Sequence, residues 1–239
     1  METVEQDQFN FHTYLHSKYP PVLQKHTETE PGELYKEIET IILSNPADLV
    51  GKLIWELPLK LEILRKNYGL TQDQREFIAS IYLHYTFDKP TSVFEKQDLL
   101  ITLNRVIGNK KLDNVRLSWK KVYHFLDEVL FSTKVDFNLG RAAIEPLFMN
   151  FLQFLKKARW LYEESHLEEL FTTVRQTIRI NDTEKVKAFA LLYCFFKGHK
   201  NYSSKYYEKY LPEIMEFWSW KIHPACDKIF FEVLSRLAK

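Results

Sequence analysis

The sequence predicts an all-α protein, an α-solenoid of antiparallel helix pairs with about ten helices. Apolar residues recur at helical spacing almost everywhere from Pro31 onward, and no segment reads as a convincing strand. Glycine is scarce, with 6 of 239 residues, and both tight β-turns and phosphate-binding loops rely on glycine. The connections between the predicted helices are short, which favours antiparallel neighbours.

Composition narrows the class of protein. Hydrophobic residues are 45% and charged residues 27% of the chain, as in an ordinary globular protein, and the 15% of aromatic residues can fill a large core. The formal net charge of +1 gives no strong attraction to nucleic acid or to a membrane surface. We therefore predict no direct nucleic-acid binding and no membrane association.

The chain carries the features of a protein from a reducing compartment. Its two cysteines, Cys194 and Cys226, cannot form a disulfide framework. The N-terminus has no basic region followed by an apolar one, so it is not a secretory signal. The longest apolar run, residues 188–196, is too short for a bilayer-spanning helix.

Two regions are expected along the chain. Residues 1–30 are polar and contain a Pro20–Pro21 break, which predicts a mostly irregular arm. Residues 31–239 are expected to form one helical-repeat domain. Its apolar stripes lie in residues 32–43, 46–66, 77–85, 92–107, 119–130, 144–155, 167–178, 186–196, 207–218 and 229–237.

Several helix ends carry residues that suit their positions. Thr71 and Gln74 form a capping-box pair before the third stripe, and Ser118 can cap the fifth helix. Gly108 stands where the C-terminal cap of the fourth helix belongs. Pro58 falls inside the second helix, removes one backbone hydrogen bond and clashes with the preceding turn, so we expect a kink or a split there. The inward stripe of the third helix is expected to comprise Phe77, Ile78, Ile81, Tyr82 and Tyr85.

The helix pairs repeat at a nearly constant spacing. The first helices of successive pairs begin near residues 72, 118, 164 and 204, so the steps are 46, 46 and 40 residues. HEAT and armadillo repeats have a period of about 40–47 residues. The spacing predicts a HEAT-like solenoid in which each pair buries its apolar face on the next, and one compact helical bundle is the alternative.

No motif makes a strong catalytic claim, and we predict no enzyme, no cofactor and no metal site. Nucleotide-binding glycine motifs and the serine nucleophile elbow are missing. His12 and His16 have the spacing of a zinc helix, but Thr13 stands where the catalytic glutamate would be. We expect the other histidines to be ordinary surface or core residues: His84, His124, His166, His199 and His223.

Four local clusters are better explained by structure than by chemistry. The acidic cluster is Glu163, Glu164, Glu168 and Glu169, which suits a helix start. The basic cluster with aromatic neighbours is Lys156, Lys157, Arg159, Trp160 and Tyr162; it could bind phosphate groups or single-stranded nucleic acid, but cations also suit a helix C-terminus. The lysine pairs Lys110–Lys111 and Lys120–Lys121 suit a solvated face, and the aromatic residues Tyr206, Tyr207, Trp218 and Trp220 suit core packing.

Several motifs occur in one collinear order. Residues 117–132 have a Leu-x-Trp-basic start, a Tyr four residues after Trp119, and an acidic-apolar-Leu-aromatic-Ser end. Residues 217–220 supply an apolar-Trp pair before a helix that ends in 231–238, where Val233 and Leu234 replace a Leu-Phe pair. Residues 68–78 contain a Tyr-Gly helix entry. In this order the chain resembles the N-terminal portion of the giant single-chain HEAT-repeat proteasome activators, and residues 18–57 are weakly similar to their extreme N-terminus.

This resemblance implies a function as well as a fold. It implies a non-catalytic piece, either a fragment or a short paralogue, of an ATP-independent activator that caps the proteasome core particle and opens its gate. Such proteins act in ubiquitin-independent degradation in the nucleus and cytoplasm, and are associated with acetylated histones and DNA repair. Their C-terminal hydrophobic-Tyr-x anchor is not matched by the final residues 236–239, and no functional residue of the family can be carried onto a position here.

Two other functions stay open at this stage. The repeat spacing alone fits a generic HEAT- or armadillo-type adaptor that holds another protein in a concave groove. An all-helical enzyme is the third reading, and it has no motivation beyond a core large enough to contain a site.

Overall fold

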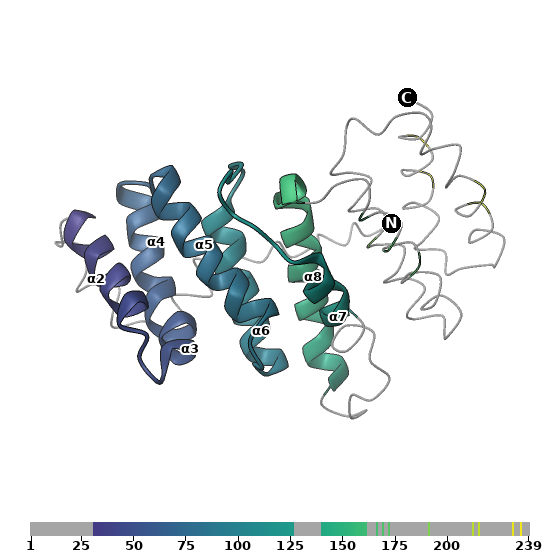
Figure 1. Ribbon diagram of the computed structural model, residues 1–239, viewed down its shortest axis with the longest axis horizontal. Coiled ribbons are helices and arrows are strands. Elements are labelled where there is room, and N and C mark those ends of the chain that lie inside the picture. Colours follow the sequence, from purple (N-terminus) through teal and green to yellow (C-terminus); the bar gives the residue numbers. More distant parts are fainter. Residues whose placement is uncertain are drawn as a thin grey trace, which may run out of the picture. The chain divides into compact units, whose positions relative to one another are not determined.

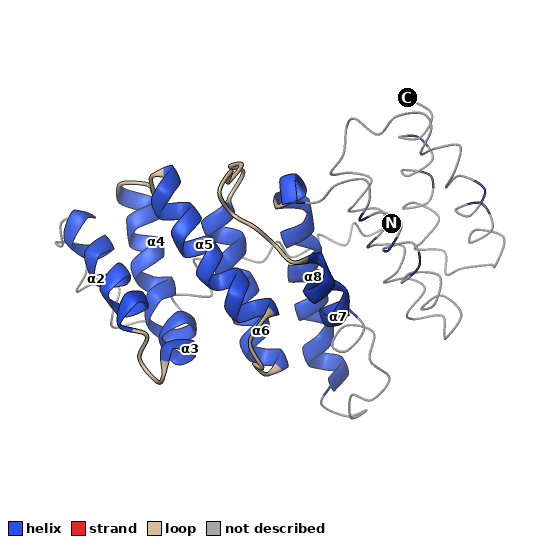
Figure 2. Ribbon diagram, in the orientation of Figure 1, coloured by secondary structure: helices blue, strands red, loops and turns tan. Residues whose placement is uncertain are grey.

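The computed structural model describes residues 31–126 and 140–161, together with eight single positions further along. These positions are His166, Glu169, Thr172, Leu191, Pro212, Met215, Phe231 and Ser235, and all eight are helical. All regular structure within the described residues is helical, with no strand among them (Figures 1 and 2). The predicted all-α class is therefore confirmed for this part of the chain.

The described residues contain six helices if the continuous helical stretch 49–67 is counted as one. This number is smaller than the ten predicted. The predicted irregular arm 1–30 and the last four predicted helices lie outside the described residues, apart from the eight single positions. The chain divides into two compact units, Met1–Thr71 and Gln72–Lys239.

In the first unit, helix α2 packs against helix α4. Helix α2 spans Pro31–Ser44, as predicted for 32–43, and its buried side chains lie one turn apart: Leu34, Ile38 and Ile42. Asn45 follows with a φ of 44°, a left-handed conformation that asparagine tolerates and that ends the helix.

The stretch 49–67 changes its hydrogen bonding beside Pro58. It begins as α3 (Leu49–Gly51), continues as a π-helical segment (Lys52–Glu56) and ends as α4 (Leu57–Asn67). The N–H of Leu57 donates to the carbonyl of Lys52, five residues earlier. Because proline cannot donate and its ring crowds the preceding turn, a wider turn just before Pro58 relieves both problems. The sequence predicted a kink or a split at Pro58, whereas the helical stretch is uninterrupted and changes its hydrogen-bonding pattern there.

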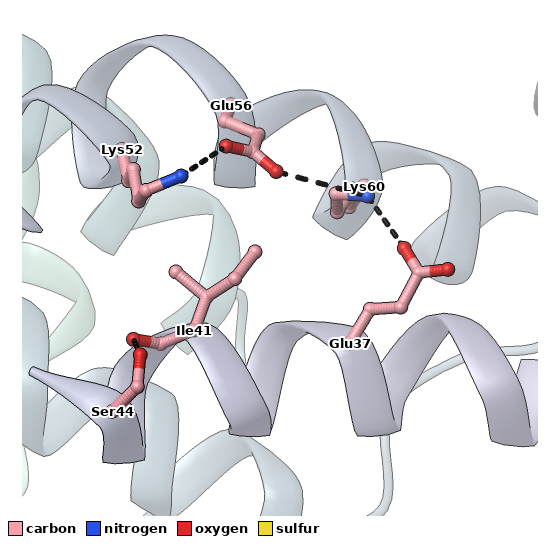
Figure 3. Close-up of polar contacts among 6 residues, drawn as sticks. All are labelled: Glu37, Ile41, Ser44, Lys52, Glu56 and Lys60. Carbon is pink, nitrogen blue, oxygen red and sulfur yellow. Dashed lines mark hydrogen bonds and ion pairs between the residues drawn. The ribbon is translucent and has the colours of Figure 1, made fainter. Parts of the chain in front are cut away.

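Charged side chains connect the two helices of this unit (Figure 3). Lys60 Nζ lies 2.6 Å from a carboxylate oxygen of Glu37 on α2 and 3.9 Å from Glu56. Glu56 also accepts a hydrogen bond from Lys52 at 3.1 Å. Beneath this network every residue of α4 from Leu57 to Leu64 is buried, so the helix is enclosed on all sides.

In the second unit, α5 and α6 form a hairpin. Helix α5 spans Gln72–Phe87 and α6 spans Val93–Ile107. Ser92 and Glu95 form a capping box at the start of α6, and Gly108, with a φ of 59°, caps its end as predicted.

The stripe predicted for α5 is wrong in part. Ile78 and Tyr82 are fully buried, but Phe77, Ile81 and Tyr85 are only partly buried. The other buried residues of this helix are Glu76, Ala79, Leu83, Thr86 and Phe87. The helix is therefore rotated so that two polar side chains point inward, where hydrogen bonds satisfy them.

Helices α7 and α8 follow as the next pair. Helix α7 spans Trp119–Phe125 and α8 spans Gly140–Lys157. Ser118 occupies the N-cap position, but its side chain makes no capping hydrogen bond, so that prediction is wrong. Four phenylalanine rings from α5, α7 and α8 form the core of this unit, with neighbouring centroids 5.3–6.3 Å apart: Phe87, Phe125, Phe151 and Phe154.

Between the two pairs, the first helix of one pair contacts the first helix of the other, and the second contacts the second. Within the first pair, α5 contacts α6; between pairs, α6 packs on α8 and α5 contacts α7 (Figure 1). The residues just after α6 and the last residues of α8 line one cavity, so the C-terminal ends of these two helices lie at the same end of the unit. Helices α6 and α8 therefore run parallel, each as the second member of its pair.

Candidate functional site

Two residues of the Leu-x-Trp motif connect α7 to residues that lie more than 40 positions further along the chain. Trp119 is buried, and its indole Nε1 donates to the carbonyl of Leu161 at 2.7 Å. The Trp119 ring stacks on His166 with centroids 4.8 Å apart. Tyr123 donates its hydroxyl to the carbonyl of His166 at 2.8 Å, and burial, with the charge of Glu169, raises the pKa of Tyr123. The motif therefore joins α7 to the segment that directly follows α8, the second helix of the same pair.

A second connection joins α6 to α8. Asn104 is buried and donates from Nδ2 to the carbonyl of Asn150 at 2.9 Å, across a separation of 46 residues. Lys157 reaches back from the end of α8 and donates to the carbonyl of Asn104 at 2.7 Å. The separation between Asn104 and Asn150 equals the predicted repeat step.

The described residues line a cavity of about 500 Å³, open to solvent, at the ends of α6 and α8. Its lining comes from the loop after α6, the last turn of α8 and the 3₁₀ turn η3 (Arg159–Leu161): Asn109, Lys111, Lys156, Lys157 and Trp160. The structure thus brings together Lys156, Lys157 and Trp160 of the predicted basic cluster and adds Lys111. Arg159 begins the adjoining turn, and Tyr162 lies outside the described residues.

Positive charge dominates this cavity. Burial lowers the pKa of the Lys157 ammonium, and the neighbouring Arg105 lowers it further. Lys111 forms an exposed ion pair with Asp113 at 2.8 Å. The indole Nε1 of Trp160 is buried and has no hydrogen-bond acceptor within the described residues. The lysines that line the cavity can therefore offer positive charge to an anion.

Elsewhere, a buried lysine has a structural role. Lys96 of α6 is buried, and its Nζ donates to the carbonyls of Thr86 at 2.8 Å and Lys89 at 3.2 Å, at the end of α5. Burial lowers the pKa of Lys96, opposed by the charge of Glu95. This arrangement satisfies carbonyls that a helix end leaves open. Nothing in the sequence pattern distinguished Lys96 from a surface lysine.

A partly exposed cluster links α5 to α7. Asp88 lies 2.7 Å from Lys121 Nζ and 2.9 Å from His84 Nδ1. Burial by itself would raise the pKa of Asp88, but the hydrogen bonds and charges of Lys121 and His84 outweigh it, so the pKa lies below its ordinary value. His84 is thus a surface histidine with a structural partner, as predicted, and Lys121 is an inter-helix contact rather than a purely solvated residue.

Several predicted candidates cannot be placed. His12, His16, Glu163, Glu164, Glu168, Tyr206, Tyr207, Trp218 and Trp220 lie outside the described residues. Within the described part of the chain, no group of three or more His, Cys, Asp or Glu side chains could hold a metal ion. Every helix in that part is too short or too polar to traverse a lipid bilayer.

One sequence signal could have located the cavity. Lys110–Lys111 and Lys156–Lys157 are dibasic pairs separated by one repeat step of 46 residues. In a parallel stack, residues one step apart lie at the same height on neighbouring repeats. Because each dibasic pair was interpreted as a separate surface feature, their shared position at one end of α6 and α8 was not predicted.

Comparison with known proteins gives no match among protein-family models, curated proteins or solved structures.

Proposed function

We propose that this chain is a non-catalytic segment of a HEAT-like solenoid, and that it belongs to an ATP-independent activator that caps the proteasome core particle and opens its gate. The observation that carries this proposal is the set of links made by Trp119 and Tyr123. Two residues of one motif that carries the sequence resemblance therefore fasten α7 to the segment that follows α8. A motif with that role has a physical reason to recur in a long array of stacked hairpins.

The packing of the second unit supports the solenoid. Like helices contact like helices, and Asn104 bonds to a position one repeat step further on. In a solenoid, each repeat meets its neighbour at a constant register; an up-and-down bundle would instead place adjacent helices antiparallel. We expect the same stacking to continue toward residue 239.

The sequence resemblance implies a binding partner, the proteasome core particle, and a cellular location. A whole protein of this kind would act in ubiquitin-independent degradation, in the nucleus and cytoplasm, with acetylated histones among its clients and a link to DNA repair. The present chain would contribute a rigid part of the cap, either as a fragment or as a short paralogue. Its contribution would be binding, with no chemical step of its own.

The direct test measures hydrolysis of a fluorogenic peptide by purified core particle, without ATP, as the purified chain is added. A gate-opening scaffold raises the rate, whereas an unfolded chain that enters as a substrate competes with the peptide and lowers it. Trp119→Ala, which removes a link between α7 and the segment after α8, should lose the stimulation, while Trp119→Phe should retain most of it. Unchanged or lowered hydrolysis, with no complex in sedimentation at micromolar concentration, would contradict the proposal.

The repeat geometry by itself favours a second function, a protein-binding adaptor of the HEAT or armadillo type. This candidate needs only the parallel packing of α6 on α8 and does not depend on the motif resemblance. Affinity capture of the tagged chain separates the two candidates. Enrichment of core-particle subunits favours the activator, and a different dominant partner, with those subunits missing, favours the adaptor.

A further inference from the structure

The basic cavity at the ends of α6 and α8 has the dimensions of a ligand site. Its volume of about 500 Å³ falls within the range of about 300–1,000 Å³ that is usual for small-molecule pockets. Residues 109–111 form one part of its lining, and residues 156–160 form another. The same interface supports both parts, because Asn104 bonds to Asn150 and Lys157 bonds to Asn104.

The lining has more cations than its structural role requires. Lys157 satisfies a carbonyl at the end of α6, which accounts for one lysine. Lys111 is paired with Asp113, but both side chains are exposed, and such pairs rearrange at little cost. Lys156 adds a further exposed charge, and Arg105 lies close enough to Lys157 to disfavour its protonation. Among the described residues that line the cavity, three are lysines and none is acidic, so this lining favours anions.

The aromatic residue narrows the class of anion. Trp160 lines the cavity and carries a buried N–H without an acceptor in the described residues. An indole offers a flat surface for a planar ring, and stacking of a base on an aromatic side chain contributes substantially to binding. Lysine ammonium groups suit phosphate oxygens, and the Asn109 amide can both donate to and accept from a base edge.

We infer that this cavity binds a nucleoside polyphosphate, with Lys111, Lys156 and Lys157 holding the phosphates and Trp160 lying against the base. This site is independent of the proposed role in proteasome activation. It involves no bond cleavage. Occupancy would fasten the loop after α6 to the end of α8, and would therefore stiffen the interface between two helix pairs.

Isothermal titration calorimetry with ATP on the full chain tests the inference. Lys156→Ala and Lys111→Ala should each weaken ATP binding about fivefold to tenfold, because each removes one charged contact. Lys120→Ala is the matched control: Lys120 is an exposed lysine on α7 outside the cavity lining, and its removal should leave affinity unchanged. Unaltered circular dichroism and thermal midpoint would show that the variants remain folded.

Three further ligands separate the components of the site. Inorganic tripolyphosphate should bind more weakly than ATP, and Trp160→Leu should remove that difference. Adenosine alone should bind least. Tripolyphosphate binding as tightly as ATP would overturn the role given to Trp160, and a single-stranded oligonucleotide binding far more tightly with the same lysine dependence would replace the nucleotide with nucleic acid. Binding that ignores Lys111 and Lys156, or no binding at millimolar ATP, would overturn the inference entirely.

Discussion

The polar contacts that join helices within each of the two compact units differ in kind. In the first unit, the contacts between α2 and α4 include a side-chain ion network, in which Lys60 joins Glu37 to Glu56 (Figure 3). In the second unit, the Asp88–Lys121 ion pair also links α5 to α7, but three further links run from side chains to main-chain carbonyls. Asn104, Trp119 and Tyr123 each donate to a backbone oxygen 42–46 residues away.

In the proposed solenoid, such links to the main chain would allow repeats to share spacing without sharing residues. An ion pair needs a matching partner side chain, so both positions must be kept together. A bond to a carbonyl needs only the backbone of the partner, which every residue supplies. Stacking of helix pairs can thus be specified by one donor per repeat and by the repeat length. The following predictions test this distinction.

Removal of the Trp119 side chain should have the largest effect. Trp119→Ala deletes a buried aromatic ring and the bond to Leu161, and should reduce the free energy of unfolding by about 3–5 kcal/mol. Chemical denaturation followed by far-UV circular dichroism measures this loss. Trp119→Phe keeps most of the packing and should lose less than half as much. Equal stability of the wild type and the alanine variant would remove Trp119 as a link between α7 and the segment after α8.

Substitution of Asn104 tests how far stability depends on hydrogen bonds to main-chain carbonyls. Asn104→Ala should cost about 1–3 kcal/mol, because it removes a buried side chain together with the hydrogen bond that it donates to α8. Asn150→Ala is the matched control, since the carbonyl that accepts this bond remains and the Asn150 side chain is exposed enough to donate to the Pro146 carbonyl of its own helix. We expect a loss below about 0.5 kcal/mol for this control. Similar losses for both variants would mean that side-chain identity at both positions matters.

Asp88 should give the α5–α7 contact a characteristic pH dependence. Because the folded-state pKa of Asp88 lies below its unfolded value of about 4, its contribution is fully present above that value and disappears as pH falls through the folded-state pKa. Asp88→Asn should therefore be less stable than the wild type at pH 6, and the gap should shrink below pH 4. Denaturation curves between pH 2.5 and 6 measure it. A gap that stays constant with pH would show that charge on Asp88 is irrelevant.

The ion network of the first unit should have the smallest effect. Glu37→Gln removes the partner of Lys60 but leaves the packing of α2 intact, and half of the Glu37 side chain is exposed. The expected loss is about 0–1 kcal/mol and should diminish further in 1 M salt. Urea denaturation at low and high ionic strength measures both. A loss as large as that of Asn104→Ala would contradict the distinction between the two units.

Local sequence signals predicted the helix ends better than the buried faces. The C-terminal end of α6 followed from Gly108, which caps it with a positive φ, although the capping box of Ser92 and Glu95 at its start was not predicted. The buried face of α5 is rotated relative to the predicted face, because Glu76 and Thr86 are buried. Glu76 accepts hydrogen bonds from Gln72 and Asn114, and the Thr86 hydroxyl bonds to Tyr82. A hydrophobic count cannot anticipate such satisfied polar groups.

The cavity and the π-helical segment show where sequence reasoning reached its limit. The basic cluster after α8 was recognised, but its meeting with Lys111 depends on parallel stacking of α6 and α8. The disturbance at Pro58 was located, but whether the helix would kink, split or widen depends on how the flanking residues pack. In each case the missing information is the tertiary contact.

Parallel stacking of α6 and α8 is the central claim, and electron–electron distance measurements test it most directly. With Cys194 and Cys226 replaced by serine, spin labels are placed at positions 110 and 156 in one sample and at positions 94 and 156 in another. Parallel helices put residues 110 and 156 at the same end, so the 94–156 distance should exceed the 110–156 distance by about 10 Å or more. Antiparallel helices gathered in one bundle would give the opposite order, and that result would contradict the solenoid.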